Sequence, residues 1–244
     1  MEKKGLLKKI LFIIIFSLVL IPSIFAYSIT LNGKSKSIAY AKDNIDKVVK
    51  IEEIKKNRIE ELREKYSNDN IVGELIIDGT KIKEPIVKYT NNDYYLYRNA
   101  YNNKDKNGAT FLDYRTNLTS KKVLIFGHSS IYEDIPFNEL EKYYSKKFYD
   151  DHKYIKVIME NETNTYEIFS VYIETSDFSY MNLNISNDTY NKHLKKYKEN
   201  SLYDTGVKVN NGDEIIILQT CSNSSKYKKY KKKYLLVIGR KVSK

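Results

Sequence analysis

The hydrophobic positions along the chain follow three different patterns. Residues 10–27 form an uncharged, mostly apolar segment, and the polar residues 28–43 follow it. From Asn44 onwards, apolar residues recur at helical spacing among Lys and Glu until the polar stretch Ser67–Asn70. This spacing predicts an amphipathic helix that packs its apolar face against the domain.

Beyond residue 70 the apolar residues alternate with polar ones or form short runs between turn signals, which is typical of β-strands. The Asp78-Gly79 pair predicts a hairpin within residues 71–87. Further strands are expected at 109–114, 123–126, 154–159, 165–175, 207–209, 215–220 and 234–242, with a helical turn within 89–101 and helices at 136–149 and 188–200. About eight strands, spread too evenly for a parallel α/β sheet, favour a mainly β fold built as a closed barrel.

The N-terminal pattern predicts export. Residues 1–9 carry four lysines, and residues 10–27 are long enough to cross a bilayer as a helix. A basic flank stays on the cytoplasmic side, so the remainder is expected outside the cell. A cleavable signal peptide ending at Ile24-Phe25-Ala26 is the alternative, but the apolar run favours an uncleaved anchor. We therefore expect a single-pass cell-membrane protein with a stalk at 28–43 and one extracellular domain at 44–244.

The net charge of +11 is concentrated near the C-terminus, because residues 221–244 contain nine basic residues and no acidic ones. In an exported protein, anionic wall polymer or lipid head groups are more plausible contacts for this segment than nucleic acid, and a solvated basic loop is the simplest interpretation. Nucleic acid is therefore not an expected partner.

Two side chains stand at predicted strand ends. Cys221 closes the run I-I-I-L-Q-T-C and is the single cysteine, and His128 closes V-L-I-F-G-H. A thiol nucleophile needs a lowered pKa or a neighbouring base, and a Cys/His pair supplies one. The alternatives are a small buried thiol and a structural histidine. His152 and His193 lie in polar surroundings.

No spacing of cysteine and histidine resembles a metal-binding motif, and no glycine-rich nucleotide-binding motif is present. We therefore expect neither a metal nor a cofactor.

The order of motifs resembles the sortases, which are cysteine transpeptidases of Gram-positive cell surfaces. A-T-F-L-D-Y-R at 109–115, V-L-I-F-G-H at 123–128, E-T-S-D-F-S-Y-M at 174–181 and the cysteine strand follow the class B order, and the resemblance covers about residues 44–242. It implies an eight-stranded barrel with a helix before the first strand and another before the cysteine strand.

The resemblance also implies a reaction. Cys221 corresponds to the nucleophile that attacks a Thr carbonyl in a C-terminal sorting motif of surface proteins, and His128 corresponds to its acid/base partner. The resulting acyl-enzyme is resolved by an amine from peptidoglycan or another protein. The family's substrate-binding region corresponds to Thr220, Tyr180 and Met181, and Ser129 adjoins the histidine.

One position departs from the family. Sortases carry an arginine at the start of the last strand, where this chain has Tyr234 with Lys233 beside it. Lys233 is the expected substitute, although it lacks the two-pronged geometry of arginine. Arg98 and Arg115 are alternatives, whereas Arg240 falls six residues past the expected place. A catalytically impaired wall-binding module and a cysteine hydrolase that releases peptides to water therefore remain as alternative functions.

Overall fold

The computed structural model describes residues 34, 36, 38, 42–43 and 58–242. The predicted basic flank 1–9 and anchor 10–27 lie outside the described residues, as does most of the predicted stalk 28–43. The chain divides into the units Met1–Glu53 and Ile54–Lys244, and the fold below is that of the second. No helix formed by the described residues is long and apolar enough to cross a membrane.

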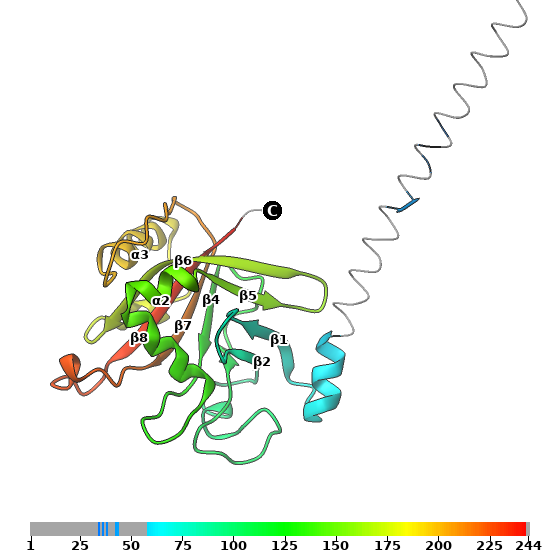
Figure 1. Cartoon of the computed structure of the whole chain (residues 1–244), viewed down its shortest axis with the longest axis horizontal. Helices are drawn as coiled ribbons and strands as arrows, with labels where there is room; N and C mark the ends of the chain where they lie inside the picture. The colour runs from blue at the N-terminus through cyan, green and yellow to red at the C-terminus, as the bar shows by residue number, and fades with distance from the viewer. Residues whose placement is uncertain (1–33, 35, 37, 39–41, 44–57, 243–244) are drawn as a thin grey trace, which may run out of the picture. The chain divides into compact units, whose positions relative to one another are not determined.

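Eight strands close into a barrel in the order β1-β2-β3-β4-β7-β8-β6-β5 (Figure 1). The strands are β1 Ile71–Ile76, β2 Lys83–Val87, β3 Phe111–Leu112, β4 Lys122–Phe126, β5 Tyr154–Ile158, β6 Thr163–Glu174, β7 Ile215–Cys221 and β8 Tyr234–Lys241. This confirms the predicted closed barrel of eight strands. The hairpin turn between β1 and β2 contains Gly79 at φ 76°, a left-handed conformation that glycine adopts without strain.

Short helices decorate the connections. The 3-10 helices are η1 Tyr95–Tyr97, η2 Pro136–Tyr144, η3 Phe178–Met181 and η4 Ser225–Tyr227, and the α-helices are α2 Lys146–Asp151 and α3 Asn187–Glu199. Residues 58–66 are also helical, which agrees with the end of the helix predicted before the first strand. The helix predicted before the cysteine strand is confirmed as α3.

Three predicted elements need correction. The helix expected at 136–149 is divided, because Ser145 takes an extended conformation between η2 and α2. The strand expected at 109–114 shrinks to the two residues of β3. No strand forms at 207–209, where the Val207 carbonyl instead accepts a hydrogen bond from Lys198 Nζ at 3.0 Å.

The continuous apolar run of β7 reflects burial on both faces. Ile216 and Leu218 belong to the hydrophobic cluster that includes residues from all the longer strands, while Ile215 and Ile217 belong to a second cluster with α3. A strand covered on both sides needs apolar residues at successive positions, which explains the absence of alternation.

Parallel pairing of β4 with β7 sets the geometry of the site. Lys122 pairs with Ile215 at one end of this pair, and Phe126 pairs with Gln219 at the other. β7 is also antiparallel to β8, with Cys221 opposite Tyr234. The carboxyl ends of β4 and β7 therefore open at the same edge of the barrel.

Candidate active site

The two predicted catalytic residues, His128 and Cys221, lie next to each other at the carboxyl ends of β4 and β7. Because the Phe126–Gln219 register continues with a hydrogen bond from Gly127 N to Gln219 O at 3.1 Å, His128 follows β4 level with Cys221 at the end of β7. Cys221 is exposed and His128 is half-buried. Tertiary structure thus brings together two residues that are 93 positions apart in the sequence.

Ser129 ties the two strand ends together. Its hydroxyl donates to the Cys221 carbonyl at 2.8 Å and accepts from Asn223 Nδ2 at 2.8 Å. The residue predicted to line a substrate site therefore also fixes the backbone of the cysteine against the loop that follows β4.

The absence of a side chain at Gly127 lets the Phe137 ring pack directly against the backbone next to His128. A Cβ atom at this position would lie 2.5 Å from the Phe137 ring, so a larger residue would displace either the ring or the backbone. Phe137 is buried on η2, whose Asn138 side chain accepts a hydrogen bond from Ser130 N at 2.8 Å. η2 therefore packs against the backbone on both sides of His128.

The His128 ring has a defined orientation. Its Nε2 lies 2.9 Å from the carbonyl oxygen of Leu96, in η1. A carbonyl only accepts, so Nε2 carries the hydrogen and Nδ1 of the neutral ring has a free lone pair. No hydrogen bond joins His128 to the Cys221 thiol within the described part of the chain; such bonds often form only when substrate is bound.

The surroundings of the Cys221 thiol favour its neutral form. Although Cys221 is exposed as a residue, partial desolvation of its sulfur by neighbouring atoms raises the thiol pKa, the Lys233 ammonium lowers it, and the Glu141 carboxylate raises it further. The net result is a pKa above the ordinary value of a cysteine. The thiol therefore needs a base to lose its proton at neutral pH.

Lys233 is placed at the start of β8 by backbone pairing. Its carbonyl accepts from Ser222 N at 3.0 Å, and Tyr234 is the direct neighbour of Cys221 across the β7–β8 pair. The Tyr234 ring packs edge-on against Phe178 with a centroid distance of 5.7 Å. Lys233 is thus the one cation that acts on the thiol pKa among the described residues.

The arginines considered as substitutes have other partners. Arg115 binds Asp113 through two nitrogens, at 2.9 and 2.8 Å, and also donates to the Met181 carbonyl. Arg98 lies over the Tyr94 ring and donates to the Asn102 carbonyl.

Arg240 is paired with Glu167 at 2.7 Å and lies opposite Ile215, at the far end of β7 from Cys221.

Thr220 directly precedes Cys221 within β7, whereas Tyr180 and Met181 belong to η3. Tyr180 is fully buried and donates to Gln219 Oε1 at 2.6 Å, and burial raises its pKa so that it stays a neutral donor. Thr220 is buried, and its hydroxyl has no partner in the described part of the chain. Met181 is half-buried, and its carbonyl is the one held by Arg115.

Two contacting groups, both on η2, were not anticipated from the sequence. Glu141 accepts a hydrogen bond from Asn223 N at 2.7 Å, and the Tyr144 hydroxyl lies 2.9 Å from the Ser222 hydroxyl. These bonds fasten η2 to the loop after Cys221. Nothing in the local pattern of η2 marks Glu141 or Tyr144, because their relation to the site arises only from long-range packing.

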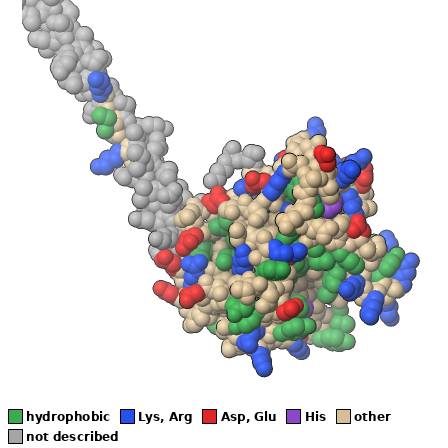
Figure 2. Space-filling model, turned by 180° about the vertical axis from the view of Figure 1, so that it is seen from behind, with side chains coloured by type: hydrophobic (Ala, Val, Ile, Leu, Met, Phe, Trp, Pro, Cys, Tyr) green, Lys and Arg blue, Asp and Glu red, His purple; other side chains and the backbone are tan. Residues whose placement is uncertain are grey.

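The segment between β7 and β8 projects from the barrel at the left of Figure 1 and at the right of Figure 2, where lysine and hydrophobic side chains gather. Lys226 and Lys229 lie over the rings of Tyr227 and Tyr230, at 5.7 and 5.1 Å. No ion pair to a carboxylate involves the lysines of residues 226–233 within the described chain. The segment is therefore an uncompensated positive surface beside the candidate site.

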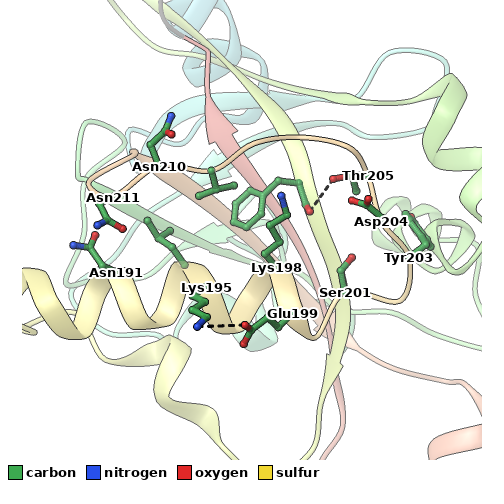
Figure 3. Close-up of a pocket in the computed structure, with 13 residues that line it drawn as sticks. Asn191, Lys195, Lys198, Glu199, Ser201, Tyr203, Asp204, Thr205, Asn210 and Asn211 are labelled. Atoms are coloured by element: carbon green, nitrogen blue, oxygen red, sulfur yellow. Dashed lines mark hydrogen bonds and ion pairs between the residues drawn. The ribbon is translucent and has the colours of Figure 1, made fainter.

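A pocket of about 650 Å³ lies away from this edge, between α3 and the loop that follows it (Figure 3). Its charged lining residues are largely engaged: Lys195 lies 3.7 Å from Glu199, and Lys198 binds the Val207 carbonyl. The pocket contributes no residue to the Cys221 site. No cluster of three metal-binding side chains occurs among the described residues.

Comparison with known proteins agrees with this architecture. Residues 75–242 match the sortase domain family. Sortase B of Listeria monocytogenes is 36% identical over 180 residues, which cover 72% of each chain. The solved structure of a Listeria monocytogenes sortase B is 32% identical, with a TM-score of 0.63, and the match covers 74% of this chain and 98% of that one.

A Staphylococcus aureus sortase B–substrate complex shares the fold at 24% identity, with a TM-score of 0.68 and coverage of 77% of this chain and 86% of that one. From the domain match and the relatives, we conclude that the chain belongs to the sortase family and is a cysteine transpeptidase of class B.

Proposed function

We propose that this sortase cleaves a C-terminal sorting motif of surface proteins through a thioester on Cys221 and transfers the acyl group to a cell-wall amine. The observation that carries the proposal is the parallel β4–β7 pairing, which brings His128 and Cys221 to one edge of the barrel. The sortase domain match over residues 75–242 supports this class of reaction.

Two proton transfers by His128 fit the orientation of its ring. As Cys221 Sγ bonds to the scissile carbonyl carbon, the thiol proton passes to Nδ1, the nitrogen that the Leu96 contact leaves free. The imidazolium then protonates the leaving amine as the C–N bond breaks. In the second half, the acceptor amine loses a proton to His128 as it attacks the thioester, and the imidazolium returns that proton to Sγ as the C–S bond breaks.

Lys233 is the proposed cation of the site. Its ammonium lowers the thiol pKa, so its charge reaches the place where negative charge develops during the attack. Thr220, Tyr180, Met181 and Ser129 are the proposed substrate-binding residues, and the partnerless Thr220 hydroxyl is a candidate hydrogen-bonding group.

We further propose an extracellular catalytic domain held at the cell membrane by residues 10–27. The support is the basic flank and the uncharged apolar run that follows it. Fractionation of cells producing the full chain, followed by protease treatment from outside, tests this: the domain is expected in the membrane fraction and accessible to the protease.

The transpeptidase is tested by incubating the full-length chain, in detergent micelles, with candidate sorting-motif peptides and an amine acceptor. Mass spectrometry is expected to show a thioester on Cys221 and an acyl–amine product. Cys221→Ala is expected to abolish both products. As a control for folding, Cys221→Ala is expected to unfold at a temperature similar to that of wild type. Hydrolysed peptide formed equally with and without acceptor would instead indicate a hydrolase.

A wall-binding module without catalysis is the second candidate, favoured by the raised thiol pKa and by the unpaired lysines at 226–233. It predicts salt-sensitive binding to anionic wall polymer and no acyl-enzyme with any peptide. An acyl-enzyme rules it out as the sole function.

A further inference from the structure

A small pocket lies at the amino ends of β4 and α3, at the opposite end of β4 from His128. Its volume is about 240 Å³. Ten residues line it, among them Arg115, Ser120, Lys121, Lys122, Asn187 and Tyr190. None of the ten is an acid. The lining is therefore positively charged and rich in hydrogen-bond donors.

Lys122 is the central feature of this pocket. It is only 6% exposed, and its ammonium donates to the Asn182 carbonyl at 2.7 Å. No carboxylate pairs with it among the described residues. Burial and the nearby Arg115 lower the pKa of Lys122 to about 8. A buried ammonium without a counter-ion is costly, so an anion from solution would remove part of this cost.

The Asp113 carboxylate beside this pocket already pairs with Arg115. Asp113 is fully buried and is bound by Arg115 through two nitrogens and by Asn92 Nδ2 at 3.1 Å. Burial opposes its ionisation, but the hydrogen bonds from Arg115 and Asn92 hold the pKa of Asp113 below its ordinary value. Asp113 therefore compensates Arg115 and leaves the charges of Lys121 and Lys122 unbalanced.

Lys121 closes the outer side of the pocket. Its ammonium lies 4.4 Å from the centroid of the Tyr190 ring and 3.4 Å from Asn187 Oδ1. These contacts hold a flexible side chain near the pocket mouth without neutralising it. Two lysines, one buried and one at the rim, therefore face the same space.

The first turn of α3 adds further donors. The Ser186 hydroxyl caps Thr189 N, while the backbone N–H groups of Asn187 and Asp188 have no acceptor among the described residues. The positive end of the helix dipole favours an anion here. The Asp188 carboxylate acts in the opposite sense, but it is exposed and does not line the pocket.

We propose that this pocket binds a phosphate group, carried by inorganic phosphate, a phosphodiester polymer or a lipid headgroup. The volume is smaller than that of a typical organic-ligand site, so it suits a small anion or the anionic part of a larger molecule. Two unbalanced lysines match the charge of phosphate. Ser120 Oγ accepts from Asn117 N, which leaves its own hydrogen free to donate to an oxyanion.

Arg115 and Lys122 also bind the backbone that follows Tyr180, one of the predicted substrate-binding residues. Arg115 donates to the Met181 carbonyl and Lys122 donates to the Asn182 carbonyl, directly after Tyr180, which bonds to the cysteine strand. A phosphate in the pocket would therefore contact the segment that carries two of the predicted substrate-binding residues.

The test is titration of the full-length chain, in uncharged detergent micelles, with inorganic phosphate at constant ionic strength balanced by chloride. Saturable heat of binding by calorimetry and a rising unfolding temperature are expected. Lys122→Met is expected to weaken phosphate binding at least about tenfold, the effect of one lost charge-assisted contact. Lys192→Met, which removes an exposed charge from α3 outside the pocket lining, is expected to bind phosphate like wild type.

Lys121→Met gives a second measure, with an expected loss of about threefold or more. A chain that shows no saturable response to phosphate, or a Lys122→Met variant that binds phosphate as wild type does, overturns the proposal. The source is then identified with soluble poly(glycerol phosphate) and with phosphatidylglycerol vesicles set against phosphatidylcholine vesicles. Tighter, Lys122-dependent binding to the polymer or to the anionic vesicles identifies that carrier, and binding to phosphate alone identifies the free ion.

Discussion

The two ends of the parallel pair β4–β7 differ in where their positive charge lies: at the carboxyl end it is carried by the lysines of the segment between β7 and β8, and at the amino end it is buried on Lys122. At the carboxyl end, His128 and Cys221 form no ion pair with any described residue and are oriented through backbone atoms, namely the Leu96 carbonyl and the Cys221 carbonyl that Ser129 binds. At the amino end, Lys122 is a buried charge beside Arg115. One pair of strands therefore presents a thiol and an imidazole at one edge and a buried positive charge at the other.

The difference indicates how each end can act. A thiol and an imidazole can exchange a proton, as acid/base chemistry requires, and the nearby Lys233 lowers the thiol pKa only in part. With a pKa of about 8, Lys122 is still mostly protonated at neutral pH, and its buried ammonium attracts anions. We therefore expect variants at the two ends to separate activity from anion binding and stability.

The largest expected effect is that of His128→Gln. Glutamine can keep a hydrogen bond to the Leu96 carbonyl but cannot take up the thiol proton, so the acylation rate should fall by about 10²–10⁴-fold. The measurement is the rate of thioester formation by rapid-quench mass spectrometry. The unfolding temperature serves as the control, and a loss below about tenfold would assign the base elsewhere.

Lys233→Met should reduce kcat by about 10²-fold, because it removes the cation proposed to stabilise the developing oxyanion. It should also raise the thiol pKa further, because Lys233 now lowers it. The pH profile of Cys221 alkylation by iodoacetamide checks this second effect. Lys232→Met, an exposed neighbour, is the matched control, and equal losses in both variants would indicate a general effect of charge.

Gly127→Ala tests the support beneath the carboxyl end. The added Cβ would meet the Phe137 ring at 2.5 Å, and such overpacking should lower the free energy of unfolding by about 2–3 kcal/mol. Urea unfolding of Gly127→Ala, Phe137→Leu and the double variant measures the coupling. If the clash is the cause, the double variant loses less than the sum of the two single changes.

Lys122→Met tests the amino end through pH. The folded-state pKa of Lys122, about 8, lies below its ordinary value of 10.5, so the unfolded chain binds more protons between these values. Stability from this group therefore rises with pH from about 8 to 10.5, and below pH 8 the buried charge costs about 3 kcal/mol. Lys122→Met should be more stable than wild type at pH 7, and the two should converge near pH 10.5.

The neighbouring groups Arg115, Asp113 and His193 do not titrate between pH 8 and pH 10.5, so they do not contribute to the expected pH dependence. Arg115 stays charged throughout, and Asp113 titrates below its ordinary range. Burial and Lys122 both lower the pKa of His193, so this histidine titrates below the range from pH 8 to pH 10.5 in which Lys122 is measured. Chemical unfolding of both proteins at several pH values measures the difference, and a constant difference from pH 7 to pH 10.5 would contradict the assignment.

Most of the barrel could be predicted because its signals are local. The uninterrupted apolar run 215–218, the Asp78-Gly79 turn and the period of residues 188–200 each reflect the burial of one element. Short elements were harder to predict. Val207 was expected in a strand, yet a lysine from α3 binds its carbonyl, a contact that no local pattern contains.

The candidate site divides in the same way. The sequence by itself determined that Cys221 and His128 end apolar runs. It also determined that Tyr234 stands where sortases carry an arginine, and that Lys233 is the cation next to that position. Only tertiary structure decided that β4 and β7 pair in parallel, which levels the two residues, and that Glu141 touches the loop after the cysteine. Burial patterns are written residue by residue along the chain, whereas strand partners, registers and the uncompensated charge of Lys122 depend on segments that are distant in sequence.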